Sequence, residues 1–262
     1  MRAAAIQLSV TDDQSPSARR DAVAEAVRAE ARRGAELVVL PEMWLPGFFG
    51  FDSYEALAEP LDGPTARLLG ELAAECGIRC CAGSIVERAP DGLYNTALLF
   101  DRDGSLAARY RKIHLFGYGS RERTLLTRGS EVVTCELGGI RFGISTCYDL
   151  RFPELYRAAV EQGAECFLVV AAWPFPRLDA WRCLARARAI ENQAGLLGCN
   201  TAGRQGTGVF AGSSLAFDAW GTPLGELDDR PGVLRVELEP ERIRAARREF
   251  TALGDRVLDR LG

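Results

Sequence analysis

The stretch that decides the fold reads Gly143-Ile144-Ser145-Thr146-Cys147-Tyr148-Asp149-Leu150-Arg151-Phe152-Pro153-Glu154. Apolar residues at alternate positions from Ile140 to Ile144 predict a strand, and residues 153–160 have the composition of a helix. Cys147 is therefore expected at a sharp turn between a strand and a helix. Backbone N–H groups and the positive end of a helix dipole near such a turn favour a thiolate and can stabilise an oxyanion. The alternative is that Cys147 is a buried, unreactive core residue, which is common for cysteine.

The composition indicates a globular protein with a mildly acidic surface. The chain has 262 residues, 47% of them hydrophobic, and a formal net charge of -4. Its arginines are interspersed with acidic residues along helical segments, which predicts a solvated surface and no nucleic-acid partner. Residues 1–13 become polar too early for a signal peptide, and the apolar run 166–173 is far shorter than the ~20 residues that span a bilayer. We therefore expect a cytoplasmic protein without a membrane segment.

The eight cysteines and the single histidine restrict the chemistry further. No two cysteines have the Cys-x-x-Cys spacing typical of structural zinc sites, so we expect no metal and no cofactor. Five cysteines in or beside apolar runs are interpreted as core residues of a protein from a reducing compartment: Cys76, Cys80, Cys81, Cys166 and Cys199. A Cys–His pair can use only His114, so another residue type is expected to take the proton of a catalytic thiol.

The order of predicted segments indicates an α/β fold made of two similar halves. In the first half we expect strands at 2–9, 37–40 and 78–84, helices at 16–33 and 64–76, and a strand pair at 94–110. In the second half we expect helices at 153–162 and 179–193, strands at 166–172 and 196–200, and a hairpin with its turn at Gly221. The tripeptide Gly34-Ala35-Glu36 recurs as Gly163-Ala164-Glu165. No linker interrupts the chain, so we predict a single domain over residues 1–262, with an internal pseudo-twofold, two packed sheets and helices outside.

Three predicted strands end in residues that can carry out chemistry. Glu42 follows the apolar run 37–40, Lys112 ends a strand of the predicted pair, and Cys147 ends a third strand. Reactive groups collect at the carboxyl ends of strands in α/β sheets. A desolvated carboxylate can accept the thiol proton, and a fixed lysine charge can stabilise the thiolate and then an oxyanion. Each residue alone could be an ordinary surface charge, but the three together suit attack on an amide or nitrile carbon.

Four blocks of the sequence, taken in order, resemble the nitrilase superfamily of carbon–nitrogen hydrolases. The blocks are Leu40-Pro41-Glu42, Tyr110-Arg111-Lys112-Ile113-His114-Leu115-Phe116, the stretch 143–154, and Trp173-Pro174 followed by Ala187-Arg188-Ala189-Ile190-Glu191-Asn192-Gln193. The similarity extends from the first strand to the hairpin near Gly221. This resemblance implies a four-layer α-β-β-α sandwich that assembles as a homodimer or higher homo-oligomer. It also implies hydrolysis of a non-peptide carbon–nitrogen bond in a small amide.

The resemblance implies roles for individual residues as well. Cys147 is similar in position to the family's nucleophile, Glu42 to its general base, and Lys112 to the lysine that stabilises the oxyanion. The backbone N–H of Tyr148 would be the second oxyanion donor. The intermediate would be a thioester on the cysteine, which water then cleaves.

The segment after the lysine block is less regular. The family often has a further glutamate that orients the lysine and the leaving ammonia, and Glu122 is the expected match, with Glu131 as the competing candidate. His114 lies within the lysine block and is expected to be structural. The chain reads Gly117-Tyr118-Gly119-Ser120 where many ω-amidases have an aspartate after the phenylalanine.

The resemblance is greatest to the ω-amidase, or Nit-like, branch, which hydrolyses monoamides of small dicarboxylic acids such as 2-oxoglutaramate. An acidic substrate needs a cation, and Arg151 is expected either to bind it or to brace the cysteine loop through Glu154 or Glu191. Trp173 either lines the acyl pocket or only packs. Other superfamily activities stay open, namely an N-carbamoyl amine or amino acid hydrolase, a secondary-metabolite amidase and a nitrilase. A non-enzymatic role is disfavoured by the intact glutamate, lysine and cysteine.

Overall fold

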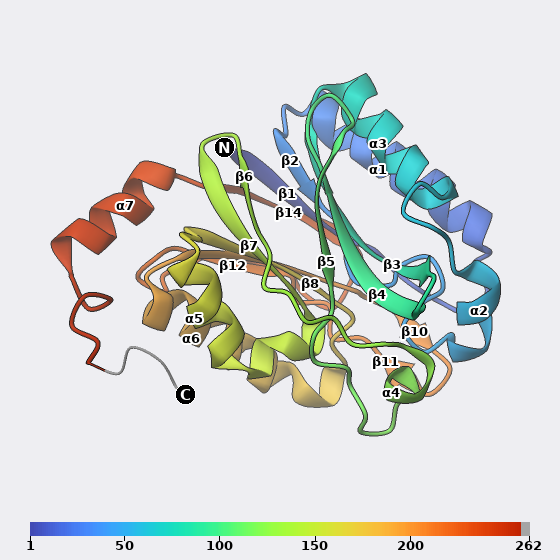
Figure 1. Cartoon of the computed structure of the whole chain (residues 1–262). Helices are drawn as coiled ribbons and strands as arrows, with labels where there is room; N and C mark the ends of the chain where they lie inside the picture. The colour runs from blue at the N-terminus through green and yellow to red at the C-terminus, as the bar shows by residue number, and fades with distance from the viewer. Residues whose placement is uncertain (258–262) are drawn as a thin grey trace.

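Two six-stranded sheets stack face to face in the computed structural model, which describes residues 1–257 (Figure 1). The first sheet consists of β1 (Arg2–Gln7), β2 (Leu37–Val39), β3 (Arg79–Ala89), β4 (Gly92–Phe100), β5 (Leu106–Arg111) and β14 (Gly232–Glu237). The second consists of β6 (Thr134–Leu137), β7 (Ile140–Thr146), β8 (Cys166–Ala171), β9 (Gly195–Asn200), β12 (Leu215–Phe217) and β13 (Pro223–Glu226). A separate small hairpin is formed by β10 (Arg204–Gln205) and β11 (Gly208–Val209).

Helices cover the outer face of each sheet. α1 (Pro16–Arg32) and α3 (Pro64–Cys76) lie on the first sheet, and α5 (Pro153–Glu161) and α6 (Leu178–Asn192) lie on the second (Figure 1). The other helical segments are α2 (Tyr54–Leu57), α4 (Glu122–Leu125), α7 (Pro240–Glu249) and the 3-10 turns η1 (Phe51–Ser53), η2 (Cys147–Arg151) and η3 (Phe175–Arg177). The expected single-domain α-β-β-α sandwich is confirmed.

The two sheets repeat one topology, which confirms the internal pseudo-twofold. The strand order is β14-β1-β2-β3-β4-β5 in the first sheet and β13-β12-β9-β8-β7-β6 in the second. Each sheet contains three parallel strands in a row, β1-β2-β3 and β7-β8-β9, and its other pairings are antiparallel. Because carboxyl ends of parallel strands meet at one edge, the residues after β2 and after β7 can reach the same space between the sheets.

The unbroken apolar run at β2 has a direct structural reason. Leu37 and Val39 face the core between the two sheets, whereas Val38 and Leu40 face the second core beneath α1 and α3. Successive side chains of a strand point to opposite faces, and here both faces are buried. The strand is thus fixed on both sides, which gives the residues that follow it a rigid support.

Several parts of the fold were not predicted. β14 pairs antiparallel with β1, opposing Glu237 to Arg2, and thereby joins the end of the described chain to its beginning, while α7 follows it. The interpretation of Cys76 as a core residue is wrong, because it lies in the last turn of α3 and is only partly buried; the other four named cysteines are buried. Within residues 1–257, no helix is both long and apolar enough to cross a membrane.

Candidate active site

Glu42 lies just beyond the carboxyl end of β2 and connects the two sheets. The chain turns sharply there, since the next residue, Met43, has a left-handed φ of 48° that is uncommon for residues other than glycine. Glu42 Oε2 accepts a hydrogen bond of 2.9 Å from the N–H of Ala172, which follows β8 of the second sheet. Its other oxygen, Oε1, accepts a hydrogen bond of 2.8 Å from Lys112 Nζ. The carboxylate is buried and fixed at both oxygens.

Lys112 directly follows β5 and is the only lysine in the chain, which otherwise uses arginine for its basic residues. Its side chain is fully buried, and Nζ also donates to both oxygens of Glu122, at 2.9 and 3.0 Å. Burial by itself lowers the pKa of Lys112, but the carboxylates of Glu122 and Glu42 outweigh it and hold the pKa above its ordinary value. Lys112 therefore carries a fixed positive charge. A compact ammonium with three donors suits this position between two carboxylates.

Glu122, at the start of α4, is the carboxylate that the structure places against Lys112. The N–H of Phe116 donates to Glu122 Oε2 at 2.7 Å, which fixes the side chain from within its own loop. Burial raises the pKa of Glu122, an effect that Lys112 opposes. The competing candidate, Glu131, is exposed.

Asn95 completes this arrangement and was missed by the sequence analysis. It lies on β4, fully buried, and its Nδ2 donates to Glu42 Oε1 at 2.8 Å and to Glu122 Oε1 at 3.0 Å. The two carboxylates are thus bridged twice, once by an ammonium and once by an amide. A polar residue inside the apolar strand 94–100 was the available signal. We call Glu42, Lys112, Glu122 and Asn95 the buried charged cluster.

Cys147 lies beside this cluster, at the junction of β7 and η2. Its φ of 48° is left-handed, so the strand ends in a strained turn at the thiol. Burial raises the pKa of the Cys147 thiol well above its ordinary value, and the Glu42 carboxylate raises it further, while Lys112 opposes the shift. Burial therefore outweighs the stabilisation of a thiolate expected from the turn. A short 3-10 turn, and not the start of α5, follows the cysteine, and desolvation dominates.

Asp149 braces the cysteine turn against the lysine block. Its Oδ2 accepts hydrogen bonds from Thr146 N–H at 2.9 Å and from the Tyr110 hydroxyl at 2.7 Å. Its Oδ1 accepts one from the N–H of His114 at 3.0 Å and lies 2.8 Å from His114 Nδ1. The His114 ring also stacks on Phe152, with centroids 3.7 Å apart. These contacts give the only histidine a bracing position in the structure.

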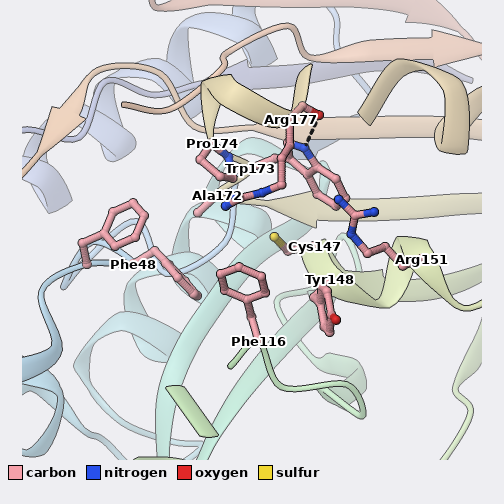
Figure 2. A pocket seen from close by; sticks show the side chains of 10 residues that line it. Phe48, Phe116, Cys147, Tyr148, Arg151, Ala172, Trp173, Pro174 and Arg177 are labelled. Carbon is pink, nitrogen blue, oxygen red and sulfur yellow. Dashed lines mark hydrogen bonds between the residues drawn. The ribbon is translucent and has the colours of Figure 1, made fainter. Parts of the chain in front are cut away.

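A small pocket opens above Cys147 (Figure 2). It measures about 330 Å³ out to its open mouth and is lined by Phe48, Phe49, Phe116, Cys147, Tyr148, Arg151, Ala172, Trp173, Pro174 and Arg177. The N–H of Tyr148 belongs to the first turn of η2, where backbone donors have no partner within the turn. Because Cys147 lines the pocket, the reacting carbon of a bound ligand can lie at the thiol.

Arg151 and Trp173 both line this pocket. The Arg151 guanidinium carbon lies 5.0 Å from the Trp173 ring, and Arg151 forms no ion pair within the described residues. Of its two expected braces, Glu154 is exposed and Glu191 pairs with Arg188 at 2.8 Å. Neither expected brace of Arg151 is therefore formed within the described residues.

Arg177 is a second pocket arginine that the sequence analysis missed. It belongs to η3, and its guanidinium carbon lies 5.3 Å from the Phe116 ring. The indole N–H of Trp173 donates to the Arg177 carbonyl oxygen at 2.8 Å, so the tryptophan does more than fill space. In the segment Trp173-Pro174-Phe175-Pro176-Arg177, the two prolines mark a loop, and the sequence carries no sign that its last residue returns to the pocket.

Comparisons with known proteins agree with this geometry. The sequence model described as "Carbon-nitrogen hydrolase" matches residues 2–248. A 2-oxoglutaramate amidase of Paenarthrobacter nicotinovorans is 39% identical, over 86% of this chain and 79% of the relative. A CN-hydrolase superfamily protein of Xanthomonas campestris, solved with an arsenic adduct in its active site, is 32% identical, with a TM-score of 0.91 over 100% of this chain and 99% of that one.

A third relative has been solved with its active-site cysteine modified. It is a glutamate-to-glutamine variant of an amidase from Nesterenkonia, 28% identical with a TM-score of 0.83, over 99% of this chain and 94% of that one. Its cysteine carries the acetamide moiety of fluoroacetamide. The expected membership of the nitrilase superfamily is confirmed, and the chain belongs to the carbon–nitrogen hydrolase family.

Proposed function

We propose that this protein is an ω-amidase-type amidohydrolase that converts 2-oxoglutaramate, or a closely similar dicarboxylic acid monoamide, to the dicarboxylate and ammonia. The observation that carries the proposal is the buried pairing of Lys112 with Glu42 and Glu122 beside Cys147, under a pocket with two arginines. The 39% identical relative named 2-oxoglutaramate amidase supports the substrate class. The cysteine adduct in the Nesterenkonia amidase supports the nucleophile.

In the first half of the proposed reaction, Cys147 Sγ attacks the amide carbon while Glu42 accepts the thiol proton. A base is required because the raised pKa of Cys147 keeps the thiol protonated at neutral pH. The carbonyl oxygen becomes an oxyanion, which Lys112 Nζ and the N–H of Tyr148 stabilise. The carbon–nitrogen bond then breaks, Glu42 passes its proton to the leaving nitrogen, and ammonia departs from a thioester.

In the second half, water replaces ammonia. Glu42 accepts a proton from the water, whose oxygen attacks the thioester carbon, and the same two donors stabilise the second oxyanion. Collapse of this intermediate releases the carboxylic acid, and the proton returns from Glu42 to Sγ. Glu122 and Asn95 do not exchange protons in this scheme. They hold Lys112 and Glu42 in place.

Ammonia release from a panel of substrates tests the proposal. Wild-type protein is expected to release ammonia from 2-oxoglutaramate faster than from N-carbamoyl amines or simple nitriles. Cys147→Ala should reduce turnover by at least about 10⁴-fold while the protein stays folded, because no other group can form the thioester. Cys183→Ala, which removes an exposed thiol on α6, is the matched control and should keep wild-type rates. Wild-type rates in Cys147→Ala, or a preference for carbamoyl or nitrile substrates, would contradict the proposal.

We also propose that residues 1–262 act as one carbon–nitrogen hydrolase domain in a cytoplasmic homodimer. Free thiols favour a reducing compartment, and the eight cysteines are all free. Trp220 and Phe250 stack on each other with centroids 6.1 Å apart, although 46% and 55% exposed, and Ile190 is 48% exposed beside them at Gly221. Such an exposed apolar group suits an interface with a second copy. Light scattering should give twice the monomer mass for the wild type and the monomer mass for Trp220→Arg. A monomeric wild type would contradict the proposed homodimer.

A further inference from the structure

The pocket above Cys147 carries an unusual excess of positive charge. Among its ten lining residues, all within the part of the chain that the structure describes, Arg151 and Arg177 are the charged side chains, and no acidic residue lines it. Figure 2 shows the two arginines reaching the pocket on either side of Trp173. The two carboxylates of the buried charged cluster bind Lys112 and Asn95, and neither forms an ion pair with these arginines within the described residues.

Both guanidinium groups have donors available for a ligand. Over residues 1–257, neither side chain forms a hydrogen bond or an ion pair; each instead lies against an aromatic ring, Arg151 at 5.0 Å from Trp173 and Arg177 at 5.3 Å from Phe116. Other arginines of comparable burial are paired, as Arg111 is with Glu87 at 2.6 Å. A stacked guanidinium is held by one face while its edge N–H groups stay free to bind.

Trp173 contacts both arginines. Trp173 contacts the Arg151 guanidinium with its ring and holds the Arg177 carbonyl with its indole N–H, 2.8 Å away. The tryptophan is itself buried, and its backbone N–H donates to Asn200 Oδ1 at 2.6 Å. The Arg177 backbone and the ring beside Arg151 are therefore held in place without a ligand, which limits the entropy lost on binding.

We propose that Arg151 and Arg177 form an arginine clamp for the 2-oxo carboxylate end of the substrate, and that this clamp excludes the corresponding α-amino acids. The inference rests on the proposed function, because it assigns the end of the substrate remote from the amide. A 2-oxo acid presents adjacent carboxylate and carbonyl oxygens, all acceptors, to the two donor forks. An α-amino acid presents an ammonium at the same carbon, which two unpaired guanidinium groups repel.

Binding to the inactive Cys147→Ala protein tests the clamp without turnover. Calorimetry would use four amides: 2-oxoglutaramate, glutarate monoamide and glutamine, which share one chain and differ at the α-carbon, and the uncharged butyramide. The expected order of affinity is 2-oxoglutaramate, then glutarate monoamide, then glutamine. Adding Arg177→Met or Arg151→Met should lower the affinity for 2-oxoglutaramate about 10- to 100-fold, which is the effect of losing one charge-assisted hydrogen bond. The affinity for butyramide should not change.

The control is Arg67→Met, which removes an exposed arginine on α3 and should change no affinity. Equal affinity for glutamine and 2-oxoglutaramate would overturn the clamp, as would an equal loss for butyramide in the arginine variants, since that loss indicates a structural role. Ammonia release by wild-type protein is measured separately. If binding of 2-oxoglutaramate depends on the arginines but wild-type protein releases no ammonia, the proposed function is overturned and the clamp is retained. If wild-type protein releases ammonia but binding does not depend on the arginines, the clamp is overturned and the proposed function is retained.

Discussion

The buried charged cluster and the arginine clamp are both near the reacting thiol, but their charges are satisfied in opposite ways. In the cluster, each charged group has a partner within 3.0 Å and is buried. In the clamp, both charges lack a partner in the described chain and border an open pocket. Paired charges are already arranged for chemistry common to every amide, whereas unpaired charges require a ligand that completes them. Catalysis and selectivity should therefore be separable by mutation.

The largest effect is expected for Lys112→Met in the cluster. The variant removes an oxyanion donor and leaves two buried carboxylates without their cation, so kcat should fall at least about 10³-fold for 2-oxoglutaramate and butyramide alike. Steady-state kinetics on both amides measure this, with circular dichroism as the check on folding. If a folded variant lost activity toward only one of the two amides, the separate roles of the cluster and the clamp would be contradicted.

A second prediction concerns the pH at which Cys147 reacts with iodoacetamide. The Glu42 carboxylate raises the pKa of the thiol and Lys112 lowers it. Removing the carboxylate in Glu42→Gln should therefore move the alkylation profile to lower pH, although turnover is lost, and Lys112→Met should move it to higher pH. Peptide mapping of the alkylated cysteine follows the reaction. Shifts in the same direction for both variants would contradict the assigned electrostatics.

A smaller effect is expected for Asn95→Leu, which keeps the volume and removes the amide bridge between the carboxylates. We expect kcat to fall about 10- to 100-fold with little change in KM, as for the loss of a hydrogen bond to a charged group. Asn95→Asp should lower kcat further than Asn95→Leu does, because it adds a third carboxylate. If instead KM rises and kcat is unchanged, Asn95 acts on substrate binding and belongs with the clamp.

The smallest effect should come from Trp173→Phe, which keeps an aromatic ring beside Arg151 and removes the N–H that holds Arg177. KM for 2-oxoglutaramate should rise a few-fold, in line with the roughly 1 kcal/mol of a neutral hydrogen bond, and KM for butyramide should not change. A drop in kcat for both amides would show that the tryptophan supports the cluster instead.

The sequence predicted the cluster better than the clamp for a physical reason. Glu42 and Cys147 follow apolar strands and Lys112 ends the predicted strand pair, so the pattern of the sequence indicates where each strand ends. Arg177 follows two prolines in a loop, and its return to the pocket depends on a hydrogen bond from Trp173 that no local pattern encodes. Arg151 was predicted to line the site, but the sequence does not show that Glu191 pairs with Arg188 and not with Arg151.

The fold shows the same limits. The main helices and several strands of both halves were predictable because their apolar faces repeat with helix or strand period, whereas short elements such as β6, α2 and α4 were not predicted. β14 was not predictable, because it pairs with β1, a strand more than 200 residues away in the chain. The raised pKa of Cys147 could not be predicted from the sequence, because a turn in the sequence reveals backbone donors but not the depth of burial around the thiol.

The most direct test of the central claim is mass spectrometry of rapidly quenched reactions with 2-oxoglutaramate and with butyramide. Wild-type protein should show both acyl groups, each mapped to Cys147. The double variant Arg151→Met/Arg177→Met should show the butyryl group at the wild-type level and little of the 2-oxo acid group, because the cluster is intact and the clamp is gone. An acyl group on another cysteine, or equal loss of both adducts in the double variant, would contradict the account.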